Sequence, residues 1–237
     1  MKRAAVIVLL VVVAIPLVLA MADLPPYGSP DSPAYTHVGA YYLEHGVEEA
    51  GAENIVTDVI LNYRGFDTEG EVTVIFTAMA AVLAVLMASR GGGEAGTRPP
   101  LTPPSVVVRF VVRVMAPLTL MFAVYVIMNG HITPGGGFQG GTIVGAVFIA
   151  LTLVLSERDA TRLIPNRPER VLQAAAPIVY CLIGLLGLAL FDVYLGYPRT
   201  EEMGLLRTAM LVTLEIGIGV GGATVIATIF RTMGSDQ

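Results

Sequence analysis

Glu215 is the residue of this sequence whose type and setting point most directly to chemistry. It is the single charged residue in the apolar run from Thr208 to Phe230. A charged side chain at the centre of a membrane helix costs about 2.5–3.5 kcal/mol on insertion scales, and such residues mark ion or proton pathways. Glu215 is therefore a candidate for a cation or proton path, and a polar contact between helices is the alternative.

A second segment with unusual chemistry is the glycine motif, residues 130–141, which holds six glycines within twelve residues. It lacks the Lys-Ser/Thr element of a phosphate-binding loop. Glycine allows positive φ and close backbone approach, and the spacing Gly137, Gly141, Gly145 predicts tight helix packing. Both a tight turn and a re-entrant dip fit the pattern. The residues of interest are Gly130, Pro134, Gly135, Gly136, Gly137, Phe138, Gln139, Gly140 and Gly141.

His131 is the one titratable residue of the glycine motif. Its ordinary pKa near neutrality suits proton handling, which makes it a candidate for the proton path. A hydrogen bond that only stabilises the turn is the alternative.

The third group is a charged segment from Tyr63 to Glu71. Thr68 and Glu71 have the spacing of a helix-capping box, and acidic residues are favoured at a helix N-terminus, so the pattern alone favours capping before the second apolar run. Arg64 and Asp67 can form an ion pair. The alternative function is an ion or proton path through Asp67, Glu69 or Glu71.

The composition of the chain indicates which class of protein must position these residues. The chain of 237 residues is 54% hydrophobic and 14% charged, with a mean hydropathy of +0.72. Soluble domains carry about 25% charged residues, so the composition excludes an ordinary soluble enzyme and a disordered chain. A net charge of −5 argues against nucleic-acid binding, and the lone Cys181 excludes an intrachain disulfide. No metal or cofactor motif is present, and the His and Glu residues between 37 and 49 fit a solvated acidic loop better than a metal site.

Six apolar runs approach the length of about 20 residues that a membrane helix needs. The sequence therefore predicts an all-α, polytopic membrane protein with about six transmembrane helices, and the first is expected to be a retained helix, not a cleaved signal peptide. The predicted spans are Ala4–Ala22, Val72–Ser89, Val114–Asn129 with a backward extension to Arg109, Phe138–Ser156, Val171–Phe191 and Thr208–Phe230.

Basic residues set the predicted orientation. With the N-terminus inside, six crossings place 11 of the 14 Lys and Arg residues on the cytoplasmic side, as the positive-inside rule requires. We therefore expect both termini in the cytoplasm, in a multi-pass protein of the cell membrane. In the long external loop, residues 23–53, a surface helix is expected over residues 35–49. Residues 54–63, just before the second span, are expected to form an amphipathic helix.

A Gly- and Pro-rich linker at residues 90–104 is the best candidate for a domain boundary. It divides the chain into a two-span unit, residues 1–89, and a four-span unit, residues 105–237.

The glycine motif resembles the signature of the MnhB/MrpB-like subunit of the Mrp-type multisubunit monovalent cation/proton antiporters, over roughly residues 105–232. That family has an acidic-Ile-Gly stretch in its last helix, usually Asp-Ile-Gly, and here it is Glu215-Ile216-Gly217. Residues 1–89 are similar to the C-terminal end of the large MrpA-type subunit, and to the matching MbhE-like small subunit in the membrane modules of archaeal hydrogenases. The stretches that carry this second likeness are residues 54–56, 63–68 and 70–71.

The resemblance implies a fusion of two subunits. It implies an accessory membrane subunit of a Na+/H+ antiporter complex, without catalytic activity or cofactors. Its implied partners are the other membrane subunits, the lipid bilayer and the transported Na+ and H+. The family carries protons along buried lysines of its large subunits, whereas the single lysine here is Lys2, so this chain is not expected to transport ions alone. The alternatives are the membrane arm of an ion-pumping redox complex, such as a hydrogenase or sulfur reductase, and a pure scaffold.

Overall fold

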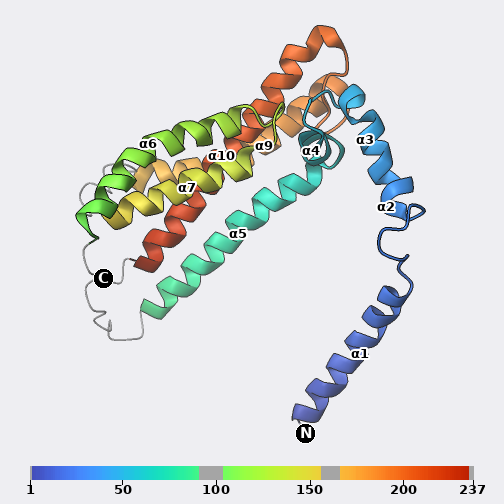
Figure 1. Ribbon diagram of the computed structural model, residues 1–237, viewed down its shortest axis with the longest axis horizontal. Coiled ribbons are helices and arrows are strands. Elements are labelled where there is room, and N and C mark those ends of the chain that lie inside the picture. Colours follow the sequence, from blue (N-terminus) through green and yellow to red (C-terminus); the bar gives the residue numbers. More distant parts are fainter. Residues whose placement is uncertain (1, 91–103, 156–165, 235–237) are drawn as a thin grey trace. The chain divides into compact units, whose positions relative to one another are not determined.

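The computed structural model describes residues 2–90, 104–155 and 166–234, and every regular element in these ranges is helical (Figure 1). Six helices are long and apolar enough to cross a membrane, which confirms the predicted all-α fold with about six spans. They are α1 (Lys2–Ala22), α5 (Gly65–Arg90), α6 (Val106–Met128), α7 (Gly137–Val154), α9 (Asn166–Phe191) and α10 (Gly204–Gly234).

Short elements connect the first and second long helices. The expected surface helix is present as α2 (Pro33–Thr36) and α3 (Val38–Glu49), which are separated at His37. The expected amphipathic helix is instead a single α-helical turn, α4 (Ile55–Thr57), followed by a π-helix, η1 (Asp58–Tyr63). A short 3₁₀ turn, η2 (Glu201–Met203), precedes α10.

Helix α5 begins at Gly65, seven residues before the predicted start of this span at Val72. The predicted capping box is wrong, because the Thr68 hydroxyl donates to the carbonyl of Ile60 at 2.6 Å instead of capping a helix. Asp67 therefore lies in the first turn of α5, where the positive end of the helix dipole tolerates it, and Glu69 and Glu71 follow in the second turn.

The described chain divides into two compact units, Met1–Glu44 and His45–Gln237. In the first unit, the apolar side chains of α1 are exposed along the whole helix, as expected for a helix that contacts lipid or another subunit. The predicted boundary at residues 90–104 falls mostly on residues 91–103, which lie outside the described residues, and it stays a prediction.

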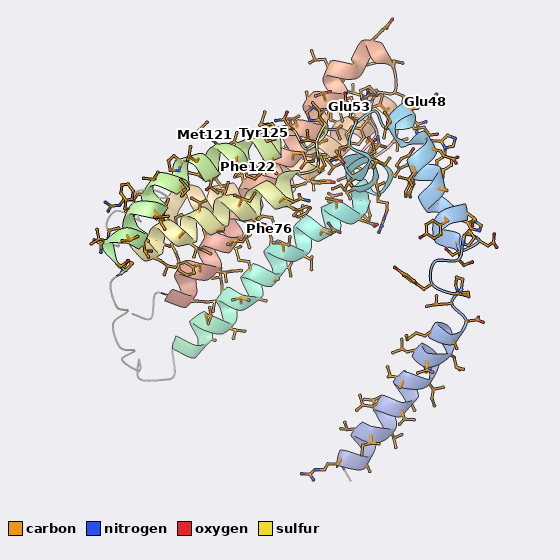
Figure 2. All side chains as sticks on the ribbon, viewed as in Figure 1. Glu48, Glu53, Phe76, Met121, Phe122 and Tyr125 are labelled. Carbon is orange, nitrogen blue, oxygen red and sulfur yellow. The ribbon has the colours of Figure 1, made fainter. Side chains whose placement is uncertain are left out.

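Helix α10 is the centre of the second unit, where it packs on α7, α9, α5 and α6. The predicted close packing of α7 is confirmed: Gly137, Gly141 and Gly145 are buried, and a Cβ atom on any of them would collide with α10. Gly141 faces Gly219, so the two helix backbones meet with no side chain between them. The outer face of α6, which carries Met121, Phe122 and Tyr125, is exposed (Figure 2).

The hydrophobic core joins sequence regions that are far apart. Leu61 of η1 and Val72 of α5 pack in one cluster with Tyr180 of α9 and with Leu214 and Ile218 of α10. This cluster fixes η1 and the start of α5 against α9 and α10, next to the residues that the sequence singles out for chemistry.

Gly141→Ala tests the packing of α7 on α10. A Cβ atom at Gly141 would lie 2.9 Å from the Cα atom of Gly219, and this backbone cannot move aside cheaply. We expect a loss of about 1–3 kcal/mol, seen as a lower Tm of the purified protein. Gly222→Ala on α10 is the matched control, because a Cβ atom there meets nothing within 4 Å. Equal Tm values for the two variants would contradict the packing argument.

Candidate functional site

The side chain of Glu215, on α10, is buried against the glycine motif, and 2% of the residue's surface is exposed. Its Oε2 atom accepts a hydrogen bond from the backbone N–H of Gly137, the first residue of α7. A helix N-terminus carries unsatisfied N–H groups and a partial positive charge, both of which stabilise a carboxylate. The side chain of Glu215 therefore caps a neighbouring helix, and its other oxygen, Oε1, is buried with no hydrogen-bond partner among the described residues.

The glycine motif gives this carboxylate its space. A Cβ atom at Gly130 or Gly136 would lie 2.8 or 2.9 Å from a carboxylate oxygen of Glu215. Gly136 also has φ +130°, a conformation that side-chain-bearing residues rarely adopt. Residues 130–136, here called the glycine loop, thus form a cradle that larger residues would fill.

The glycine loop is a compact turn between α6 and α7. The N–H of Gly136 donates to the carbonyl of Val126 at 3.2 Å, and the Thr133 hydroxyl donates to the carbonyl of Asn129 at 3.1 Å. Glu215 lies about 16 Å along α10 from Gly204, at the level of the first residue of α7. Because Glu215 bonds the first residue of α7, it lies at one end of the α6–α7 pair and not at its middle.

Asn54 and Thr57 hold the glycine loop from the other side. The Asn54 side-chain amide donates to the carbonyls of Gly130 at 2.7 Å and Thr133 at 3.0 Å, and the Thr57 hydroxyl also donates to Gly130 at 2.7 Å. The Asn54 backbone N–H donates to the carbonyl of His131 at 3.2 Å. We call Asn54 and Thr57 the loop clamp. In the sequence, Asn54 belongs to the stretch 54–56 that carries the second family likeness, and Thr57 lies directly after it.

Asp58 is a buried carboxylate that sequence reasoning missed, with 1% of its surface exposed. Its Oδ1 atom accepts the N–H of Ala52 at 2.9 Å, and its Oδ2 atom has no partner among the described residues. Burial raises the pKa of Asp58 to about 6, against the lowering effects of the Ala52 hydrogen bond and the charge of Arg207. In the sequence it looked like one polar position of an amphipathic pattern.

His131 contacts the loop clamp through its backbone carbonyl, which accepts the Asn54 N–H. Its side chain is partly buried, and its Nδ1 atom has no hydrogen-bond partner within the described part of the chain. Burial lowers the pKa of His131 below its usual value, while the charge of Glu53 acts in the opposite direction. Burial therefore favours the neutral imidazole, and a proton-handling role stays a prediction.

The charged segment from Arg64 to Glu71 divides into an outer and an inner part. Arg64 and Asp67 form the expected ion pair, at 2.5 Å and on the surface, and Glu71 is exposed. Glu69 instead accepts hydrogen bonds from the Tyr194 hydroxyl at 2.8 Å and from the Cys181 thiol at 3.1 Å. Among these acidic residues, Glu69 is the one whose hydrogen bonds link α5 to α9 and to the α9–α10 connection.

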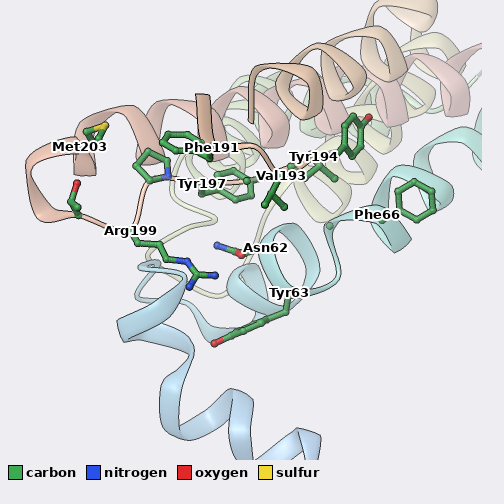
Figure 3. Close-up of a pocket in the computed structure, with 14 residues that line it drawn as sticks. Asn62, Tyr63, Phe66, Phe191, Val193, Tyr194, Tyr197, Arg199 and Met203 are labelled. Carbon is green, nitrogen blue, oxygen red and sulfur yellow. The ribbon is translucent and has the colours of Figure 1, made fainter. Parts of the chain in front are cut away.

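A pocket of about 660 Å³ opens beside this connection (Figure 3). Its walls come from η1, the start of α5 and the segment between α9 and α10. They include Asn62, Phe66, Tyr194, Tyr197 and Arg199, all labelled in Figure 3.

Two protein families match the chain. The family described as a domain related to the MnhB subunit of Na+/H+ antiporters matches residues 107–226, and the MbhE family, described as one of the subunits of MBH, matches residues 4–100. A Rhizobium meliloti protein named as the A/B subunit of a probable K(+)/H(+) antiporter is 26% identical over an alignment of 230 positions, which covers 81% of this chain and 22% of that protein. The chain thus spans about a fifth of that relative's length. These matches confirm the resemblance predicted from the sequence.

Two solved structures are similar. One chain of the membrane-bound sulfane sulfur reductase, an archaeal respiratory membrane complex, is 33% identical with a TM-score of 0.70, covering 98% of this chain and 97% of that one. A chain of the Mrp complex from Dietzia sp. has a TM-score of 0.71 at 23% identity, covering 100% of this chain and 26% of that one, and this likeness concerns the fold alone.

Asn54→Ala tests the loop clamp. Loss of its buried hydrogen bonds should cost about 1–3 kcal/mol of local stability. We expect hydrogen–deuterium exchange of the amides in residues 130–137 to quicken by about tenfold or more. Asn129→Ala is the matched control, because the Asn129 side chain bonds the carbonyl of Tyr125 within its own helix. Unchanged protection of these amides in Asn54→Ala would mean that the glycine loop is stable without the loop clamp.

Asp58→Asn tests the buried carboxylate. The folded-state pKa of about 6 lies above the ordinary value of 3.8, so the folded chain binds this proton more tightly and loses stability as pH rises from about 4 to above 6. Asn keeps an oxygen for the Ala52 N–H and does not titrate. We expect the Tm of Asp58→Asn, minus that of the unmodified protein, to increase from pH 5 to pH 7.5. Exposed Asp31→Asn should give no such trend, and parallel curves for Asp58→Asn would refute the assignment.

Proposed function

The chain belongs to the family of domains related to the MnhB subunit of Na+/H+ antiporters, and we propose that it serves as an accessory membrane subunit of a multisubunit monovalent cation/proton antiporter. Six of its helices are long and apolar enough to cross a membrane, and the similar solved structures are multisubunit membrane complexes. In this role the chain forms part of the ion path and of the subunit interfaces, and carries out no covalent chemistry.

The observation that carries this proposal is the half-satisfied carboxylate of Glu215. One oxygen is anchored by the Gly137 N–H, which fixes the position of the group, and the other is buried without a protein partner in the described structure. A carboxylate in a dry site is costly unless it is protonated or bound to a cation. Glu215 is therefore suited to exchange a proton for a cation at Oε1 while Oε2 stays in place.

The proposal includes an orientation. Both termini lie in the cytoplasm of the cell, which puts the glycine loop, the loop clamp and the pocket at the external side of the membrane. The asymmetry of basic residues in the sequence supports this orientation. The exposed apolar helices α1 and α6 then face lipid or the neighbouring subunits.

A second candidate is the membrane arm of a respiratory redox complex. The end-to-end likeness to one chain of the sulfane sulfur reductase, at 33% identity, favours it specifically. The same accessory role applies there, with electron transfer in other subunits as the driving reaction. Identification of the proteins that co-purify with this chain decides between the two: cysteine-rich redox subunits would indicate the respiratory complex.

Glu215→Gln separates ion exchange from helix capping. The amide oxygen of Gln can still accept the Gly137 N–H, so we expect the complex to assemble, while the loss of the titrating group abolishes Na+-driven proton movement in inverted vesicles. Exposed Glu202→Gln is the matched control and should exchange normally. If assembled Glu215→Gln complexes exchange Na+ and protons at the normal rate, Glu215 acts only as a helix cap. That result would favour the alternative of a pure scaffold.

A further inference from the structure

We propose that Asn54 and Thr57, the loop clamp, are positioning residues for ion exchange at Glu215. They hold the Gly130 carbonyl away from the carboxylate and so keep its Oε1 atom unpaired, open to a proton or a cation. The inference rests on the proposed function, because it concerns the same carboxylate. It adds that the part of the chain matched by the MbhE family, residues 4–100, helps to build a site whose acidic residue lies in the part matched by the MnhB-related family.

The loop clamp occupies the Gly130 carbonyl completely. This oxygen accepts one hydrogen bond from the Asn54 side-chain amide and one from the Thr57 hydroxyl, both at 2.7 Å. A carbonyl oxygen has two lone pairs, so these two donors use its full capacity. The Asn54 amide also donates to the Thr57 hydroxyl oxygen at 3.1 Å. The two side chains are therefore one connected group that fixes the direction of this carbonyl.

The direction of the Asn54 amide is itself fixed. Its Oδ1 atom accepts the N–H of Val56 at 3.1 Å and caps α4, which leaves its NH2 group facing the glycine loop. The same NH2 group also donates to the Thr133 carbonyl at 3.0 Å. Both clamp side chains are buried, Asn54 with 8% and Thr57 with 0% of its surface exposed, so bulk water cannot replace either donor. Helix α4 thus presents both donors to the loop as a fixed pair.

On the other side of the loop, the carboxylate of Glu215 meets C–H groups. A Cβ atom at Gly130 would lie 2.8 Å from Oε1, so a Cα hydrogen of Gly130, and not its carbonyl oxygen, points toward Oε1. Gly136 is equally close to the carboxylate, but its N–H donates to the carbonyl of Val126 instead. Among the described residues, only the Gly137 N–H bonds the carboxylate. The clamp thus accounts for the unpaired state of Oε1.

An unpaired, buried carboxylate oxygen gains the most from a proton or a cation, because nothing else stabilises the charge at that atom. A glycine loop without the clamp is free to turn, since glycine adopts many backbone conformations. Backbone N–H groups of the loop, or water, then compete with the cation for Oε1. Loss of the clamp therefore weakens cation binding, and its effect is expected in the KM for Na+.

The test exchanges the Thr57 side chain in the intact complex and measures Na+-driven proton movement in inverted vesicles over a range of Na+ concentrations. Thr57→Val keeps the volume and removes the hydroxyl. We expect its KM for Na+ to rise by about threefold to tenfold, as for the loss of one buried hydrogen bond, at nearly unchanged kcat. Thr57→Ser keeps the hydroxyl, loses a methyl group and is expected to restore most of the affinity. Thr73→Val is the matched control, because the exposed Thr73 hydroxyl bonds the carbonyl of Glu69 within its own helix.

The KM does not depend on how many complexes assemble, so it separates positioning from a merely structural role. Normal KM in assembled Thr57→Val overturns the inference, and so does an equal rise in Thr57→Ser, which would assign the effect to packing. Asn54→Ala is the second variant, with the same expected rise in KM, and it decides if Thr57→Val fails to assemble. If neither variant assembles, the clamp acts in assembly alone and the inference fails.

The positioning role and the proposed function fail in different ways. If Glu215→Gln is inactive while the clamp variants have a normal KM for Na+, the proposed function stands and the positioning role is wrong. If the unmodified complex moves no protons with Na+, the proposed function itself fails.

Discussion

The hydrogen bond between the Glu215 carboxylate and the Gly137 N–H sets the architecture around it. A carboxylate that has left water needs a partner, and the exposed N–H groups and partial positive charge at the start of α7 supply one. The carboxylate can reach that N–H only where no side chain intervenes. The absence of side chains at Gly130 and Gly136, and the contact of Gly141 with Gly219, follow from this requirement.

Much of the architecture could be predicted from the sequence, because long apolar runs determine spans whatever their partners. The glycine motif and Glu215 were each singled out, but their contact was not, since a pattern along one chain does not say which helices meet. The predicted start of α5 was wrong because a search for charge-free runs leaves out the first turn of the helix, which holds Asp67. The burial of Asp58 was not predicted, because an amphipathic pattern does not distinguish a buried acidic residue from an exposed one.

Several polar side chains of the second unit are buried. They include the loop clamp and Glu215, which contact the glycine loop, and also Asp58, Tyr180 and Tyr197. Each such group costs free energy unless it is paired, so the few unpaired atoms among them, Oε1 of Glu215, Oδ2 of Asp58 and the Tyr197 hydroxyl, are the costly ones within the described residues. The apolar outer faces of α1 and α6 contrast with these buried polar groups and suit contact with lipid or other subunits.

The loop clamp has a consequence for assembly. Its hydrogen bonds join residues 76 and 79 positions apart, across the region where the family likeness passes from one family to the other. When two such halves are separate chains, their pairing depends on how much of each the cell makes. A covalent tether turns that pairing into an intramolecular event with a high effective concentration. The tether fixes the two halves at equal stoichiometry, and a contact of a few hydrogen bonds is then enough to hold the glycine loop in register.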